Sequence, residues 1–382
     1  MIQTNANNER NGWIDLLRIL ACVLVVFAHC CDSFTAAFDS DKSLFLTGAS
    51  LGSLTRPSVP LFVIMSAFLL LPVGEGVSLG EFYKKRIGRV LPPLIFWSIA
   101  LPIAFYLYYG YLNPMSTNPM VDTSVYTPDT LIKRIWLMVF NFNFDTVPLW
   151  YLYMLVGLYL IMPMLSAWLR SASRKDILLV LKIWGFTLLI PYIKMAVPHV
   201  GYTGNFGSME IFGACDWNVY GTFYYLSGFI GYMILAYYVK RWPVTSSKSK
   251  LIGWSVVSFI VGYIITFGGY VTIQNYFPGD YSYLEVVWYF TGINVAMMTI
   301  PIFLIFSRLR IVSRPWMRQL ASLTFGIYLC HFIFVYMTYD LFHIAGLPAF
   351  VRIICMTAVS FGCAAGVTAI LNLNRYTKKL IA

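Results

Sequence analysis

Three ionisable residues, Asp15, Arg18 and His29, lie within one apolar stretch of membrane-spanning length, WIDLLRILACVLVVFAHCC at residues 13–31. Ionisable side chains inside a membrane span are costly, and they commonly mark functional sites. At 100° per residue, Arg18 and His29 fall within about 20° of each other on a helix, and Asp15 falls within about 60° of Arg18. The three side chains therefore share one stripe, which we expect to face the protein interior.

His29 is the strongest candidate for a general base. The eleven residues from Arg18 to His29 rise about 16 Å along a helix, which places the arginine near one membrane face and the histidine deep toward the other. A neutral imidazole at that depth can accept a proton from a substrate hydroxyl. The alternative is a buried histidine that is hydrogen-bonded to a neighbouring helix. Arg18 on the same stripe favours the functional interpretation.

Two further ionisable residues are expected at a similar depth. Arg56 enters the second apolar stretch beside Pro57 and Pro60, which free backbone carbonyls and loosen the helix. Its guanidinium can stabilise a developing oxyanion or hold an anionic group; the alternative is an arginine that extends to the outer headgroups. His331 lies roughly 18 Å into a later span, at a depth similar to that of His29. Two intramembrane histidines at similar depth indicate that both line one cavity.

The segment EFYKKRIGRVLPP carries Arg86 and Arg89 three residues apart on one helix surface. Such a cluster suits phosphate groups, although the positive-inside rule also places basic residues at any such boundary. Trp150 and Tyr151 begin the fourth apolar stretch and are candidates for the mouth of the same cavity. Aromatic residues at a membrane boundary are also typical of the interfacial belt.

The composition shows that the elements which position these residues belong to a polytopic membrane protein. Of 382 residues, 59% are hydrophobic and 11% are charged, and the mean hydropathy is +0.71, whereas roughly a quarter of the residues of soluble domains are charged. We predict an all-α fold in a single domain, 1–382, with a short amphipathic helix at 131–142 in the membrane interface. Apolar windows predict about ten spans, at 13–33, 51–71, 87–109, 147–168, 177–197, 219–239, 252–272, 286–306, 320–340 and 349–371.

The net charge of +11 reflects membrane topology rather than nucleic-acid binding. Basic residues gather in alternate loops on the side of the N-terminus, and most acids lie in the opposite loops. Both termini are therefore expected in the cytoplasm, with the first span retained and the chain crossing the inner (plasma) membrane several times. Seven cysteines, an odd number without a CxxC pair, favour neither a disulfide framework nor a metal site.

The order of these motifs resembles the integral-membrane acyltransferase family 3 over nearly the whole chain. The family's first-helix signature, an arginine, ten residues and a histidine, is matched by Arg18 and His29. Arg56 matches the arginine before VPLF, although the usual Ser-Gly pair that follows reads Ser66-Ala67 here. Further matches are Arg86 and Arg89, the segment LWYLYMLVGLYLIMP from Leu149, FYYLSGFIGY from Phe223, and GIYLCH ending in His331.

The resemblance implies transfer of an acyl group, commonly acetyl from cytoplasmic acetyl-CoA, to a hydroxyl of a lipid-linked or cell-envelope glycan. It is nearest to the branch without a fused soluble domain, which includes enzymes that acetylate surface antigens. In this interpretation His29 is catalytic, Arg18 with Asp15 helps to hold the donor, and Arg86 and Arg89 contact the coenzyme A phosphates. Direct transfer and an acyl-histidine intermediate both remain open.

Two other classes of protein fit parts of the pattern. A secondary transporter would also contain many helices with intramembrane charges and proline-broken segments, but the sequence has no visible inverted repeat. The separate class of membrane-bound O-acyltransferases also uses an intramembrane histidine, which would here be His331. Alanine variants of the two histidines distinguish this class from the first interpretation.

Overall fold

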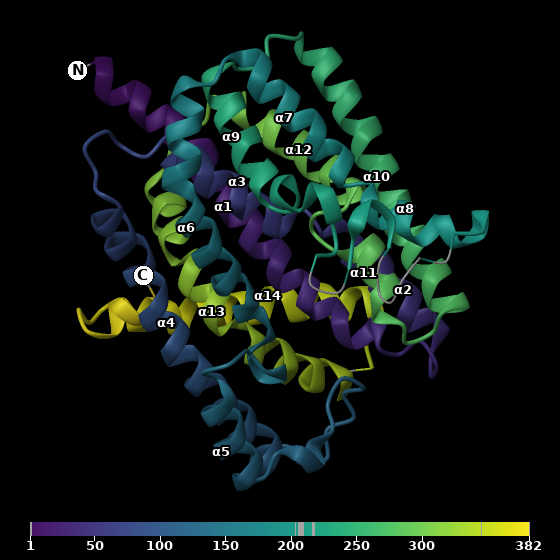
Figure 1. Cartoon of the computed structure of the whole chain (residues 1–382). Helices are drawn as coiled ribbons and strands as arrows, with labels where there is room; N and C mark the ends of the chain where they lie inside the picture. The colour runs from purple at the N-terminus through teal and green to yellow at the C-terminus, as the bar shows by residue number, and fades with distance from the viewer. Residues whose placement is uncertain (1, 203, 205–209, 216–217, 345, 382) are drawn as a thin grey trace. The chain divides into compact units, whose positions relative to one another are not determined.

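The computed structural model describes residues 2–202, 204, 210–215, 218–344 and 346–381. These residues form helices, turns and connecting segments without a β-strand (Figure 1). Within them, nine helical segments are long and apolar enough to cross a membrane. The predicted all-α, polytopic fold class is therefore confirmed.

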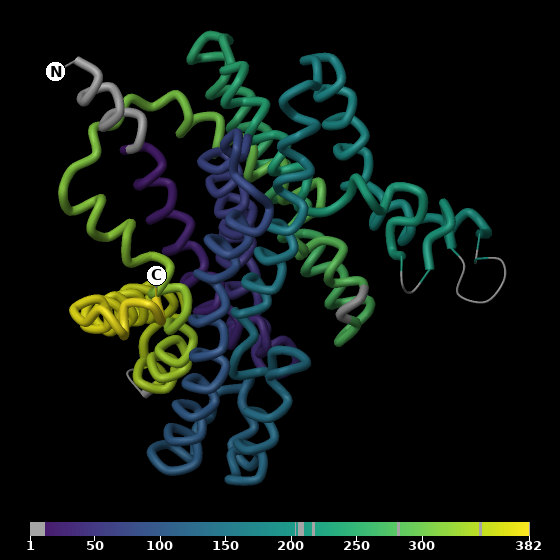
Figure 2. Tube along the Cα trace, turned by 60° about the vertical axis from the view of Figure 1, so that its left-hand side comes forward, coloured from purple at the N-terminus to yellow at the C-terminus, as the bar shows by residue number. Residues whose placement is uncertain are grey.

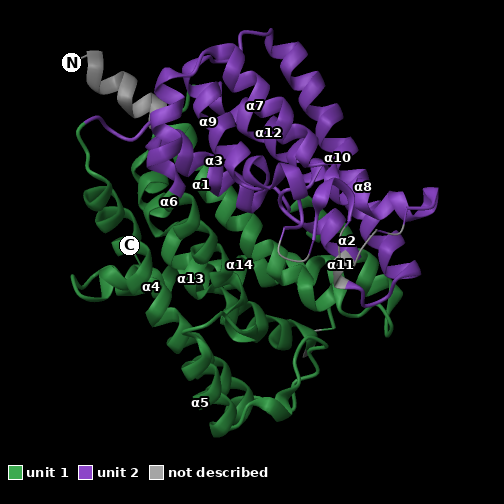
Figure 3. Ribbon diagram, in the orientation of Figure 1, with its two compact units in different colours: residues 1–55, 76–160, 310–382 green, residues 56–75, 161–309 purple. Residues whose placement is uncertain are grey.

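The chain divides into two compact units, drawn in two colours in Figure 3. Unit 1 comprises residues 1–55, 76–160 and 310–382, and unit 2 comprises residues 56–75 and 161–309. The assignment of 1–382 to a single domain stays a prediction.

Unit 1 contains the first helix and the last two, which pack together although they come from opposite ends of the chain. The C-terminal helices α13 and α14 lie side by side in Figures 1 and 2, and both contact α1. The helices of this unit are α1 (Ile2–Thr35), α2 (Lys42–Leu54), α4 (Leu79–Leu107), α5 (Pro128–Leu137), the start of α6 (Trp150–Ser171), α13 (Pro315–Ile344) and α14 (Ala349–Leu371), with shorter turns η1 (Tyr108–Leu112), η2 (Thr123–Val125), η3 (Phe144–Leu149) and η7 (Thr377–Leu380).

Local sequence signals fix where α2 and α4 begin. The Asp41 carboxylate accepts hydrogen bonds from the backbone N–H groups of Ser43 and Leu44, which caps α2. Ser78 and Glu81 form a reciprocal capping box at the start of α4.

Gly48 lets α2 approach α1 closely, because an added Cβ would lie 2.7 Å from the Cβ of Phe34. A Cβ–Cβ distance this short is not found between real side chains, so a larger residue would push the two helices apart. The close contact therefore holds the end of α1 that carries His29.

Unit 2 contains α3, which packs against α9 and α12, and the long helix α10, which packs against α11 and α12. Its helices are the end of α6, α3 (Ser58–Leu70), α7 (Arg174–Thr187), α8 (Ile190–Ala196), α9 (Ile230–Arg241), α10 (Lys248–Tyr276), α11 (Tyr281–Trp288) and α12 (Ile293–Ser307), with shorter turns η4 (Val197–Val200), η5 (Ile211–Gly213) and η6 (Gly221–Leu226).

The prediction of one helical span at 219–239 is wrong. The residues form the turn η6 and the separate helix α9, which has 12 residues. Gly228 between them has a φ of 71°, a left-handed conformation that ends regular helix. An apolar window measures hydropathy and does not register such a break.

Three other predicted spans contain breaks that the apolar windows did not indicate. The segment at 51–71 is divided between α2 and α3 at residues 55–57, where Pro57 disfavours helix at the preceding residue. The segments at 177–197 and 286–306 are likewise divided between α7 and α8 and between α11 and α12. The predicted helix at 131–142 is present as α5, from Pro128 to Leu137; its place in the membrane interface stays a prediction.

Candidate active site

His29 pairs with Asp32 near the end of α1. The His29 Nδ1 lies 2.8 Å from the Asp32 Oδ2, and the two side chains are one turn apart on the same helix. When Nδ1–H donates to the carboxylate, the lone pair of the neutral ring remains on Nε2 and is free to accept a proton. His29 is partly exposed, with 19% of its side chain accessible. The arrangement has the elements of a base and the acid that orients it.

Asp32 is a site residue that the apolar pattern of the sequence did not indicate. It lies near the end of the predicted span at 13–33, and α1 continues helically to Thr35. The spacing HCCD was the available signal, because residues three apart on a helix are neighbours. The helix therefore has to extend beyond the apolar stretch for the pair to form.

His331 lies against His29, with their ring centroids 5.3 Å apart. It is fully buried in α13, and its Nδ1–H donates to the Tyr328 backbone carbonyl at 2.7 Å. This bond leaves the lone pair on Nε2, which is buried and finds no hydrogen-bond partner among the residues that the structure describes. The structure thus brings the two predicted histidines together and leaves an unused acceptor on the second.

Aromatic side chains surround the two imidazoles. The ring of Phe332 lies edge-on to His29 at 5.1 Å, and the ring of Tyr328 lies 5.9 Å from His331. Tyr151 packs against Tyr328 at 5.5 Å, and Trp150 packs edge-on to Tyr151. Of the two predicted mouth residues, Tyr151 is buried and connects to the histidines through Tyr328, and Trp150 is one ring further away.

The turn η3, which leads into α6, is bonded both to α13 and within itself. The Tyr328 hydroxyl donates a hydrogen bond to the backbone carbonyl of Pro148 in this turn. In the same turn, the Thr146 hydroxyl accepts a hydrogen bond from the backbone N–H of Asn143 at 2.9 Å. These bonds fix the position of Tyr151, at the start of α6, relative to Tyr328.

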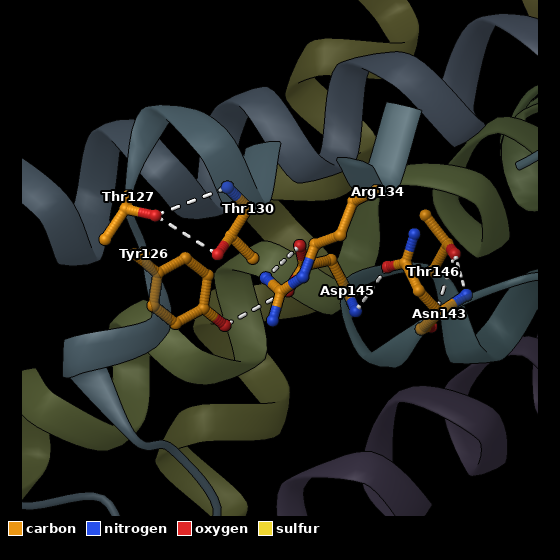
Figure 4. A network of polar contacts seen from close by, with 7 residues as sticks. All are labelled: Tyr126, Thr127, Thr130, Arg134, Asn143, Asp145 and Thr146. Atoms are coloured by element: carbon orange, nitrogen blue, oxygen red, sulfur yellow. Dashed lines mark hydrogen bonds and ion pairs between the residues drawn. The ribbon is translucent and has the colours of Figure 1, made fainter. Parts of the chain in front are cut away.

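A second buried acid, Asp145, anchors the same turn (Figure 4). Its carboxylate forms an ion pair with Arg134 of α5 at 2.6 Å and accepts a hydrogen bond from the Tyr126 hydroxyl at 3.0 Å. Burial, and then the nearby Asp145 carboxylate, raises the pKa of Tyr126, so its hydroxyl keeps its proton and acts as a donor. The Tyr336 hydroxyl interacts electrostatically with both Asp32 and Asp145. The network of Tyr126, Arg134 and Asp145 is therefore linked to the His29–Asp32 pair through Tyr336.

The predicted donor-side residues also lie in unit 1. The Ser313 hydroxyl donates to the Asp15 carboxylate at 2.8 Å, and Arg18 is half-buried roughly one turn further along α1. Arg86 and Arg89, near the start of α4, both interact electrostatically with the Tyr159 hydroxyl.

Arg86 and Arg89 differ in their exposure. Arg89 is exposed, whereas Arg86 is half-buried and its Nε finds no hydrogen-bond partner in the described part of the chain. A buried guanidinium N–H without a partner is costly, so a bound anion would satisfy it. The unsatisfied Nε of Arg86 and the exposed guanidinium of Arg89 make the pair suitable for a phosphate group.

Arg56 lies in unit 2 and is 8% exposed. Its Nε donates to the Trp288 backbone carbonyl at 2.8 Å, and its guanidinium carbon lies 4.6 Å from the Trp288 ring and 4.2 Å from the Phe290 ring. Glu285 in the same segment interacts electrostatically with it. A buried guanidinium packed against two rings disagrees with the alternative in which Arg56 extends to the headgroups. Its part in stabilising an oxyanion stays a prediction.

Comparison with known proteins identifies the family. A family model of acyltransferase family 3, described as an acyltransferase domain, matches residues 11–369. No curated protein and no solved structure gives a significant match. The matched region includes every helix from α2 to α13 and most of α1 and α14. The chain therefore belongs to acyltransferase family 3 and is a membrane acyltransferase.

Proposed function

We propose that the protein transfers an acyl group, in the simplest case acetyl, from acyl-CoA to a hydroxyl of a cell-envelope or surface glycan. The observation that carries this proposal is the His29–Asp32 pair beside His331, on helices long enough to cross a membrane. The plasma membrane is the proposed location, since it separates cytoplasmic acyl-CoA from the envelope. The family match supports acyl transfer over the transporter alternative.

In the proposed reaction, His29 Nε2 removes the proton from the acceptor hydroxyl while the hydroxyl oxygen attacks the thioester carbonyl. Asp32 stabilises the imidazolium that forms. When the tetrahedral intermediate collapses, the carbon–sulfur bond breaks and His29 returns the proton to the coenzyme A thiolate. The products are the O-acyl ester and coenzyme A. Arg56 is the proposed partner of the oxyanion.

His331 is proposed to bind the acceptor rather than to begin the reaction. Its Nδ1–H is held by the Tyr328 carbonyl, and its free Nε2 is suited to accept a hydrogen bond from a substrate hydroxyl. Tyr151, which packs on Tyr328, and Trp150 beside it are proposed to line the approach of the acceptor.

The donor is proposed to enter from the cytoplasmic side. Arg86 and Arg89 would contact the coenzyme A phosphates, and Arg18 with Asp15 would hold the donor further along. The pantetheine arm would then follow the stripe of α1, which rises about 16 Å from Arg18 to His29. The family resemblance implies these roles, and the charges and the helix geometry of the residues are compatible with them.

The test uses purified protein, acetyl-CoA, and unacylated envelope polysaccharide from a strain that lacks this chain. We expect His29→Ala to reduce coenzyme A release and acetyl transfer by about 10²–10⁴-fold, because it removes the general base. His331→Ala should have a smaller effect, mainly on the KM for polysaccharide.

The two histidine variants also distinguish the alternatives. Normal transfer by His29→Ala at normal abundance would contradict the proposal, and loss only in His331→Ala would favour the membrane-bound O-acyltransferase mechanism. Solute uptake into vesicles without acetyl-CoA, together with no acetyl transfer by the wild type, would favour a transporter.

A further inference from the structure

Unit 2 contains a cavity of about 720 Å³ between α8, α11 and the segments that follow them. This volume lies within the range of pockets that bind small molecules, about 300–1,000 Å³. The residues that give it its chemistry are three tyrosines, two glutamates and one lysine: Tyr220, Tyr283, Tyr289, Glu210, Glu285 and Lys194. Every lining residue that the structure describes belongs to unit 2, whereas the two histidines belong to unit 1.

Two of the three tyrosine rings are held by contacts outside the cavity lining. Tyr283 stacks on Phe277 with ring centroids 4.6 Å apart, and Tyr289 packs edge-on to Phe229 at 6.2 Å. Rigid tyrosines provide an apolar face and a polar edge with little loss of side-chain entropy on binding. A pyranose ring has the complementary surface, with apolar C–H faces and a rim of hydroxyls.

The charges of the cavity favour hydroxyl-bearing ligands over phosphates. Lys194, the one cation among the described residues of the lining, forms an ion pair with Glu210. Glu285 forms no ion pair within 4 Å in the described residues, and its carboxylate oxygens are able to accept hydrogen bonds from a ligand. Among the described lining residues, one lysine against two glutamates leaves a net charge of −1, and the Arg56 guanidinium outside the lining interacts electrostatically with Glu285. Such a lining is better suited to uncharged hydroxyls than to the phosphates of coenzyme A.

The cavity wall also supports Arg56. Tyr289 lines the cavity, and its two neighbours in the chain supply the Trp288 carbonyl and the Phe290 ring that hold Arg56. A ligand that contacts Tyr289 therefore contacts the residue between Trp288 and Phe290, the two residues that orient the Arg56 guanidinium. By the positive-inside pattern, we expect the connections that form this cavity to face away from the cytoplasm.

We propose that this cavity binds a sugar residue of the acceptor glycan, with the Tyr289 ring against the sugar face and Glu285 accepting hydrogen bonds from sugar hydroxyls. The proposal rests on the proposed function. A smaller cavity of about 240 Å³ shares Lys194 and Glu210 with the first. In this proposal, the next sugar of a longer glycan would lie on the far side of the ion pair.

The experiment measures acetyl transfer by the full-length protein against the concentration of unacylated envelope polysaccharide and, separately, of acetyl-CoA. Tyr289→Leu and Glu285→Gln should each raise the KM for polysaccharide about tenfold or more, with the KM for acetyl-CoA unchanged. Tyr289→Phe keeps the ring and should retain most of the affinity. Tyr225→Leu is the matched control, because Tyr225 is 85% exposed on η6 and lies outside the cavity lining.

Polysaccharide binding without acetyl-CoA, measured by tryptophan fluorescence, separates this proposal from the proposed function. If the wild type binds and the two variants bind about tenfold more weakly, the cavity assignment stands even if no acetyl is transferred. Equal binding by wild type and variants, or no binding by the wild type, would overturn it. A rise in the KM for acetyl-CoA instead would assign the cavity to the donor and would also overturn it. The elution profile of each variant in detergent checks that it is folded.

Discussion

Two aspartates of unit 1, Asp32 and Asp145, both interact electrostatically with Tyr336 but differ in their charged partner and in their exposure. Asp32 pairs with His29, and 35% of its side chain is exposed; Asp145 pairs with Arg134, and its side chain is fully buried. Histidine can gain and lose a proton near neutral pH, whereas arginine remains charged. The first pair is therefore suited to proton transfer, and the second is suited to holding a turn in place.

The first way to test this comparison is Asp32→Asn. An amide can leave His29 in the wrong tautomer, so we expect the rate of acyl transfer to fall by about 10²–10⁴-fold. Protein abundance and thermal unfolding should change little, because the aspartate is partly exposed. The measurement is kcat for coenzyme A release by the purified variant.

Asp39→Asn is the control for that variant, since Asp39 is exposed in the segment after α1. It should retain full activity. If Asp32→Asn also retains full activity, the pair with His29 has no part in catalysis and the contrast with Asp145 is lost.

The second test is Arg134→Ala, which leaves the Asp145 carboxylate buried without its cation. Breaking a buried ion pair in this way costs about 3–5 kcal/mol, so we expect a clear loss of thermal stability in detergent. The fraction that remains folded should keep a nearly normal kcat. The double variant Arg134→Met with Asp145→Asn removes both charges and should recover much of the stability. A double variant as unstable as Arg134→Ala would show that the charge of Asp145 is not the cause.

The smallest expected effect is that of Tyr126→Phe, which removes one hydrogen bond to Asp145 and keeps the ring beneath Arg134. A hydrogen bond to a charged group contributes about 1.5–3 kcal/mol, so the loss should be smaller than that of Arg134→Ala. Thermal unfolding of the two variants side by side gives the order. A kcat that falls as far as in Asp32→Asn would place Tyr126 in the catalytic site instead.

The two histidines show how much of the site can be predicted. His29 and His331 are both conspicuous in the sequence, because an ionisable residue in an apolar stretch stands out in a one-dimensional pattern. Their shared depth follows from helix rise alone. Asp32 does not stand out, because it lies near the end of the predicted span at 13–33, where an acid close to the membrane surface needs no functional explanation.

The sequence by itself determined the all-α membrane fold, most of the spans and the family, because hydropathy, charge placement and motif order are read along the chain. Tertiary structure decided which side chains meet. It brought α1 and α13 together from opposite ends of the chain, packed Arg56 against Trp288 and Phe290, and formed the cavity of unit 2 from separate segments. It also divided the predicted span at 219–239 at Gly228. Contacts of this kind depend on packing in three dimensions, which no periodicity of a single segment encodes.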